Sequence, residues 1–214
     1  MLKVLSFTFN PFRENTYLII NEAKETIVVD PGMYDNVELT EFYTCIESQQ
    51  LKPVKILNTH AHIDHIFSVA VLKRKYNIPF GLHEAELPVL ANARTAAQIY
   101  GLKFPDTPEV DFYLKEDEII SFGDSQMSLM LTPGHSPGSI SFYAPKEGFV
   151  ISGDVLFQNG IGRTDLPGGN YNQLIESIQN KLFMLPAATM VYPGHGPVTQ
   201  INIEKEYGFL TKCL

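Results

Sequence analysis

Three histidines and an aspartate stand within six residues of this 214-residue chain, at His60-Ala61-His62-Ile63-Asp64-His65. The apolar run at 54–59 before them predicts a buried strand. Because alternate side chains of an extended segment point the same way, His60 and His62 can hold one metal ion. After Ile63 the apolar spacing becomes helical, so Asp64 and His65 face a new direction. The segment predicts two adjacent metals rather than a structural zinc site, which is normally closed by four ligands rich in cysteine.

Three later strand ends supply further candidate ligands. Predicted strands at 126–132, 149–152 and 190–192 lead into His135, Asp154 and His195. A Pro-Gly pair precedes each of these two histidines and permits a sharp turn of the backbone. Side chains that follow strand ends at one edge of a sheet can converge in a shared cleft.

The order of the predicted elements indicates an α+β fold of two sheets packed face to face with helices outside. Asp35 is placed to cap an early helix, and Asn170 a late one, with Gln173 completing a capping box. The late helix would turn four apolar residues inward, which are Leu174, Ile178, Leu182 and Leu185. The predicted strands outside the ligand segments cover 2–9, 16–21, 26–30 and 139–144.

Composition narrows the class of protein. The net charge of −8 argues against a nucleic-acid-binding face, which would be basic. Neither a signal-peptide layout nor an apolar run of about 20 residues is present, so no membrane association is expected. Cys45 and Cys213 are interpreted as free thiols in a reducing compartment. Together these features predict a soluble cytoplasmic protein.

The ligand candidates carry a resemblance to a known family. His60 to His65, His135, Asp154 and His195 resemble the ligand set of the metallo-β-lactamase superfamily. The stretch Gly160–Gly169 is similar to its glyoxalase II (hydroxyacylglutathione hydrolase) branch, and the likeness covers nearly the whole chain. It also includes the segments 15–19, 30–32, 132–135 and 192–197. The resemblance implies a four-layered αββα sandwich.

The same resemblance implies a binuclear metal centre. His60, His62 and His135 would hold the first metal, Asp64, His65 and His195 the second, and Asp154 would bridge both. Zinc is the first expectation, and iron or manganese also suits histidine and carboxylate ligands.

The implied activity is hydrolysis of a small-molecule thioester of the hydroxyacylglutathione type. A metal-bridging hydroxide would attack the carbonyl, so the catalytic residues would be Asp64, which orients the hydroxide, and Asp154. Full-length glyoxalase II enzymes continue into a helical C-terminal domain that helps bind glutathione, whereas 19 residues follow His195 here. We therefore expect one domain over 1–214 without that addition, and the thiol carrier and the oligomeric state stay open.

Two other functions fit part of the pattern. A persulfide dioxygenase of the same superfamily would hold one iron through His60, His135 and Asp154. That branch tends to carry Ala and Asp around the last histidine, where this chain has Gly194-His195-Gly196-Pro197, so hydrolysis is favoured. A hydrolase of another ester or a lactone, and a metal-binding module without catalysis, are further alternatives.

Several residues have competing interpretations. Ser136 lies in a G-x-S-x-G pattern, but the next residue is Pro137, which lacks the N–H that a nucleophile elbow requires. Arg163 either contacts the substrate or pairs with Asp165. His83 is interpreted as a partly buried histidine at a strand end.

The segment 89–117 fits the two-sheet plan least well. It begins rich in alanine and helical, and then passes through Gly101 and two prolines. It is either a surface connection or a lid over the substrate pocket, with Tyr100 and Phe104 as its apolar contacts.

Overall fold

The computed structural model describes residues 1–104 and 106–212, so the predicted thiol at Cys213 lies outside the described residues. The first sheet has the strand order β1-β2-β3-β4-β5-β6. Its first three strands are antiparallel neighbours, and β3 to β6 run parallel. The strands are β1 (Lys3–Phe9), β2 (Glu14–Ile20), β3 (Glu25–Val29), β4 (Lys52–Leu57), β5 (Phe80–His83) and β6 (Phe112–Leu114).

The second sheet has the order β14-β13-β10-β9-β8-β7. Only the pair β10 and β13 is parallel, and this pairing brings the ends of the two strands that precede Asp154 and His195 side by side. The strands are β7 (Ile119–Phe122), β8 (Ser125–Leu131), β9 (Ile140–Ala144), β10 (Phe149–Gly153), β13 (Met190–Pro193) and β14 (Thr199–Gln200). A small hairpin, β11 (Leu156–Phe157) and β12 (Gly160–Ile161), lies apart.

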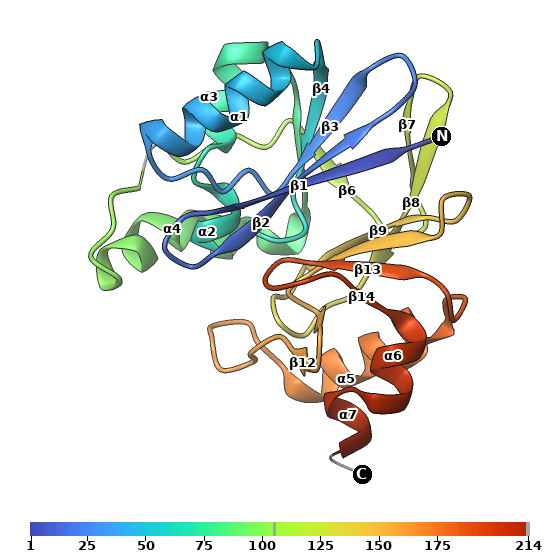
Figure 1. The fold of residues 1–214 in the computed structure, drawn as a ribbon. Coiled ribbons are helices and arrows are strands. Elements are labelled where there is room, and N and C mark those ends of the chain that lie inside the picture. The colour runs from blue at the N-terminus through green and yellow to red at the C-terminus, as the bar shows by residue number, and fades with distance from the viewer. Residues whose placement is uncertain (105, 213–214) are drawn as a thin grey trace.

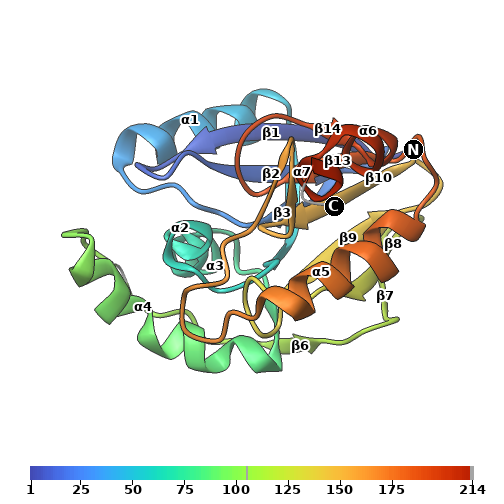
Figure 2. The ribbon, with the colours of Figure 1, turned by 90° about the horizontal axis from the view of Figure 1, so that it is seen from below.

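Helices flank the paired sheets on both outer sides, which gives the four layers that the sequence predicted (Figures 1 and 2). The first group covers the first sheet and comprises α1 (Asn36–Ser48), α2 (Ile63–Ile66), α3 (Val69–Tyr76) and α4 (Leu87–Ile99). The second group covers the second sheet and comprises α5 (Tyr171–Asn180), α6 (Ile201–Tyr207) and α7 (Phe209–Lys212). The short 3₁₀ turns are η1 (Glu84–Glu86) and η2 (Leu182–Met184).

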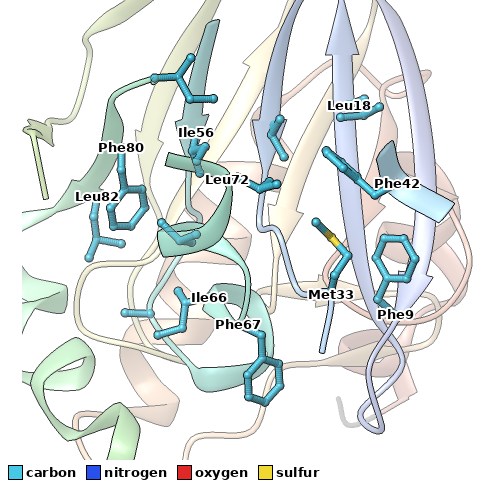
Figure 3. Close-up of a cluster of buried hydrophobic side chains, with 14 of the residues drawn as sticks. Phe9, Leu18, Met33, Phe42, Ile56, Ile66, Phe67, Leu72, Phe80 and Leu82 are labelled. Carbon is cyan, nitrogen blue, oxygen red and sulfur yellow. The ribbon is translucent and has the colours of Figure 1, made fainter. Parts of the chain in front are cut away.

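Three apolar cores join these layers. Figure 3 shows the outer core of the first sheet, where Phe42 of α1 and Leu72 of α3 pack toward Leu18 and Ile56. A second core fills the space between the sheets, and a third joins β10 and β13 to α5 and α6. Both sheets are thereby packed on each face, which holds the loops at the strand ends in place.

The predicted helix caps are present, with one difference. Asp35 accepts hydrogen bonds from the N–H groups of Val37 and Glu38 at 2.8 and 3.0 Å. Asn170 accepts one from Gln173 N at 3.1 Å, but the N–H of Asn170 itself donates to Gly134 O at 2.7 Å. That bond replaces the return half of a capping box and ties the start of α5 to the loop that carries His135.

Two helices are shorter than the apolar spacing predicted. The helix after Ile63 breaks between α2 and α3, because Ser68 donates its N–H to Pro31 O at 2.9 Å and its hydroxyl to Met33 O at 2.5 Å. In the late helix, α5 ends at Asn180, so Leu182 packs inward from η2 and Leu185 follows that turn in extended backbone.

The segment 89–117 contains both a helix and an unpredicted strand. The helix α4 spans its first half, and β6 pairs parallel with β5 at the edge of the first sheet. Phe104 lies 6.0 Å from Phe67, ring centroid to ring centroid, and packs against the outer core of the first sheet. No helix within the described ranges is long and apolar enough to cross a membrane.

Candidate metal centre

The loop after β4 and the loop after β8 bring three histidines together. His135 Nε2 lies 2.8 Å from His62 Nδ1 and 3.3 Å from His60 Nε2. Their ligand atoms all lie within 4.8 Å of one another. His60 and His62 therefore face one point, as their spacing predicted, although β4 ends at Leu57 and both stand on the loop beyond it.

A second group of three forms beside the first. Asp64 Oδ2 lies 3.2 Å from His195 Nε2 and 3.7 Å from His65 Nε2. Asp64 and His65 stand on α2, whose start redirects the chain away from His60 and His62. The apolar pattern predicted this change of direction after Ile63, which separates the two groups.

Asp154 stands between the two groups. Its Oδ2 lies 3.5 Å from His135 Nε2 and 3.4 Å from His195 Nε2, and its Oδ1 lies 3.5 Å from His65 Nε2. All seven predicted ligands thus converge on one place.

Hydrogen bonds on the far side of four imidazoles fix which nitrogen faces the centre. His65 Nδ1 lies 3.1 Å from Asp30 Oδ2, His135 Nδ1 2.8 Å from Arg163 O, and His195 Nδ1 3.1 Å from Phe12 O. His60 Nδ1 lies 3.0 Å from Thr59 Oγ1, whose own proton is donated to Asp30. In the neutral imidazole, each acceptor holds the proton on Nδ1, so that Nε2 presents its lone pair to the centre.

These bare lone pairs are the test of whether metal ions fit. His65 Nε2 and Asp154 Oδ1 are buried without a hydrogen-bond partner, and they face each other at 3.5 Å. A Cβ on Gly194 would lie 2.0 Å from Asp154 Oδ1, so only glycine leaves room for that carboxylate. Acceptors that converge without donors repel one another unless cations lie between them. The donor set therefore fits divalent metal ions.

Residues 9–195 match the pattern of the Metallo-beta-lactamase superfamily. The chain belongs to this superfamily. Among curated relatives, the probable metallo-hydrolase YqgX of Bacillus subtilis is 39% identical over 92% of this chain and 91% of its own length. The hydroxyacylglutathione hydrolase GloC of Haemophilus influenzae is 34% identical, with 91% of each chain covered.

Solved structures agree with the superfamily assignment. The BLEG-1 B3 metallo-beta-lactamase superposes with a TM-score of 0.89 and 37% identity, over 96% of this chain and 98% of that one. TTHA1623 in a di-iron-bound form gives a TM-score of 0.86 and 37% identity, over 95% and 98%. This metallo-β-lactamase fold, its clustered ligands and its relatives support a metal-dependent hydrolase.

Burial and the neighbouring groups set the charges of the site. Burial, and then the neighbouring His135, lowers the pKa of His62 to about 3, which keeps this imidazole neutral. Burial alone would lower the pKa of His195, but hydrogen bonds to Asp154 and Asp64 outweigh it and raise the pKa to about 11. Without a cation at the centre, Nε2 of His195 therefore keeps a proton that a bound metal ion would replace. Burial opposes ionisation of Asp154, yet the surrounding histidines hold its pKa well below the usual range.

Three buried carboxylates that lie around the centre, those of Asp30, Glu14 and Glu86, were not singled out from the sequence. Asp30 accepts hydrogen bonds from Thr59 N and Oγ1 at 2.7 and 2.6 Å, in addition to its contact with His65. Glu14 Oε1 lies 3.9 Å from His65 Nδ1 and has no hydrogen-bond partner. Glu86 supports the histidine loops from the other side. Isolated acidic residues carry no sequence signal of this role, although Asp30 lies in one of the matched segments.

Hydrogen bonds from strand β2 hold the loop that carries His195. Asn15 Nδ2 donates to Pro193 O at 3.0 Å and to Gly196 O at 2.8 Å, and Asn15 N donates to Gly194 O at 2.7 Å. Tyr17 Oη donates to Pro193 O at 2.7 Å. The matched segment 15–19 thus positions a ligand loop about 180 residues away in sequence.

Three residues with competing interpretations have well-defined surroundings in the structure. Ser136 is fully buried and donates its hydroxyl to Glu86 Oε1 at 2.6 Å, so it is no exposed nucleophile. His83 ends β5, is half-buried and accepts a hydrogen bond from Ala85 N at 3.2 Å, as predicted for a histidine outside the site. Arg163 makes two hydrogen bonds of 2.7 Å to the carboxylate of Asp165, which is the local pairing. Arg163 also lines the cavity, so its contact with the substrate stays a prediction.

A cavity of about 1090 Å³ opens onto the centre. Asp64, Asp154 and three of the histidines lie at its inner end, and Arg163 lines it farther out. Residues of α4 and Tyr100 form one wall, so this part of the segment 89–117 shapes the pocket. Phe104 is not among the described residues that line the cavity and packs against the outer core instead, so of the two apolar contacts named for the lid alternative only Tyr100 lies at the pocket.

Proposed function

We propose that this chain hydrolyses small-molecule thioesters, with those of the hydroxyacylglutathione type as the first to be tested. The observation that carries the proposal is the convergence of seven potential metal ligands, five of which line the cavity. His60, His62 and His135 would hold one divalent ion, and Asp64, His65 and His195 the other, with Asp154 shared. Zinc is our first choice, and the di-iron form of a 37% identical structure supports iron as an alternative.

When bound, two divalent ions supply a water of lowered pKa and a Lewis acid for the carbonyl oxygen. Asp64 would accept a hydrogen bond from the attacking water and so orient it. Asp30, Thr59 and the carbonyl of Arg163 keep the imidazoles in the required tautomers. The protein thereby supplies position and electrostatics, and its own nucleophile is not needed.

The lining of the cavity favours a thioester over an amide. Among its described residues, Asp64 and Asp154 are the carboxylates, and both belong to the ligand set. An amine leaving group needs a proton from a general acid, whereas a thiolate leaves without one. The name of the GloC relative, a hydroxyacylglutathione hydrolase, supports the same choice.

The test is hydrolysis of S-D-lactoylglutathione by the zinc-loaded chain, followed as loss of thioester absorbance. His60→Ala and Asp154→Ala should each reduce kcat by at least about 10³-fold. His83→Ala is the matched control, because His83 is half-buried outside the centre, and it should keep activity.

Metal analysis and parallel assays identify the alternatives. Two metals without thioester turnover would overturn the substrate class. Nitrocefin hydrolysis would then favour a β-lactam, in line with the similarity to BLEG-1. One bound iron with oxygen uptake on a glutathione persulfide would instead support a persulfide dioxygenase.

A further inference from the structure

The cavity in front of the metal centre has an apolar wall that the proposed reaction does not explain. Apolar α4 residues that line it include Val89, Ala93, Ala96 and Ile99 at helical spacing, with the polar Asn92 and Thr95 beside them. The rest of the apolar lining includes Ile63, Phe157, Ile161, Leu166 and Pro167. A ligand whose carbonyl lies at the metal centre must place its remaining atoms among these apolar side chains.

Large apolar side chains stand exposed at the outer end of this wall. Ile99 is 79% exposed and Tyr100 49% exposed, and both line the cavity. The ring of Tyr100 meets that of Phe12 edge to face, with centroids 5.1 Å apart. This contact closes α4 against the loop between β1 and β2, so the apolar surface is continuous around one side of the cavity.

The charges of the cavity do not match a glutathione arm. Outside the metal-binding clusters, Arg163 is the one charged side chain among the described lining residues. It forms two hydrogen bonds to Asp165, and this pairing raises the pKa of the guanidinium. Glutathione carries two carboxylates and an ammonium group, and their desolvation among these apolar side chains would meet a single, already paired cation.

We propose that the α4 wall binds an apolar arm of the thioester, either an alkyl or aryl acyl group or an apolar thiol. This inference rests on the proposed thioesterase activity and names the substrate class within it. Binding of the arm would cover Ala96, Ile99 and Tyr100, and would account for their exposure beside a polar centre.

Two series of thioesters test the inference and separate the two sources of the arm. The first varies the acyl chain from acetyl to hexanoyl on N-acetylcysteamine, and the second varies the thiol from methyl to hexyl at constant acetyl. In the series that enters the pocket, kcat/KM should rise about two- to fourfold per methylene. Hexanoyl-N-acetylcysteamine or its thiol counterpart should also exceed S-D-lactoylglutathione. Two flat series, or a preference for the glutathione ester, would overturn the proposal.

A matched pair of variants assigns the effect to α4. Ala96→Leu fills part of the cavity beside α4. It should reduce the ratio of kcat/KM for the hexanoyl substrate to kcat/KM for the acetyl substrate by about tenfold. Ala91→Leu makes the same change on an exposed position of the same helix outside the cavity, and should leave the ratio unchanged. If the hexanoyl-to-acetyl ratio of kcat/KM were the same in Ala96→Leu and Ala91→Leu, binding of the arm at the α4 wall would be contradicted.

Calorimetric binding of uncleavable thioethers keeps this test separate from that of the proposed function. If the zinc-loaded chain cleaves none of the thioesters, the thioesterase proposal fails. S-hexyl-N-acetylcysteamine should nevertheless bind at least about tenfold more tightly than the S-methyl compound. Equal affinity or no binding would overturn the apolar arm by itself.

Discussion

The carboxylate of Glu86 accepts a hydrogen bond from the hydroxyl of Ser136 at 2.6 Å, next to His135 in the chain. The same carboxylate accepts one from Gly138 N at 2.7 Å and one from Ala61 N at 2.9 Å, between His60 and His62. Glu86 is fully buried, and burial raises its pKa despite these three donors. One side chain thus fixes the distance between the two loops that carry the first group of histidines.

Glu86→Gln is expected to loosen that group. An amide can accept through one oxygen only, so its NH₂ would face an N–H or O–H that has lost its acceptor. We expect the free energy of unfolding to fall by about 1–3 kcal/mol and zinc affinity to fall about 10- to 100-fold. Urea unfolding and zinc titration measure the two effects. Glu84→Gln, an exposed change in the same turn, is the control. Equal zinc affinity in both variants would contradict the role of Glu86.

Asp111 provides a pH-dependent contribution to stability away from the metal centre. Burial acts to raise its pKa, but the ion pair with Lys73 at 2.7 Å and the bond from Phe80 N lower it overall. A lowered folded-state pKa stabilises above the unfolded value of about 3.9, and the stabilisation disappears as the pH falls through the folded value.

Asp111→Asn should therefore lower the free energy of unfolding at pH 7 by no more than about 1 kcal/mol, because the pair is partly exposed. The difference from the parent should shrink below about pH 4, where the parent carboxylate also becomes neutral. Urea unfolding of both chains with a chelator, at pH 7 and pH 3.5, measures this. Glu109→Gln removes an exposed charge from the same segment. A pH dependence shared by the two variants would contradict the assignment to Asp111.

The Arg163–Asp165 pair can be tested by comparing its two halves. The loop of this pair also offers Arg163 O to His135. If the pairing only orders this loop, either alanine substitution removes that order to the same extent. We expect Arg163→Ala and Asp165→Ala to raise KM for the best thioester by factors within about threefold of each other. A much larger increase for Arg163→Ala alone would show that the guanidinium contacts the substrate.

The sequence predicted the convergence of the seven candidate ligands well, because such residues lie in dense local patterns. His60 to His65 occupy six residues, and His135 and His195 each follow a Pro-Gly pair past a strand. The sequence also indicated the layers, since helical and strand spacings are local properties. The break between α2 and α3 could not be predicted, because its cause is a bond from Ser68 to Pro31 in a distant segment.

Supporting residues were harder to predict than ligands. Glu86 acts through backbone N–H groups at Ala61 and Gly138, and any residue type offers such donors. The wall of α4 was also ambiguous, since alanines beside exposed Ile99 and Tyr100 fit a surface helix as well as a pocket. Only the packing of α4 beside the ligand loops decides between these interpretations.

Gly194 provides the sharpest test of the shared carboxylate position. A Cβ at this residue would lie 2.0 Å from Asp154 Oδ1 and 2.8 Å from His65 Cε1, so Gly194→Ala must displace the carboxylate or the loop. We expect zinc stoichiometry to fall from two to one or fewer, with thioester turnover reduced at least about 100-fold. Gly160→Ala is the matched control, because its nearest contact would be an ordinary 3.8 Å to Phe157. Metal analysis after dialysis measures the outcome, and two tightly bound zinc ions in Gly194→Ala would contradict a position of Asp154 between both metals.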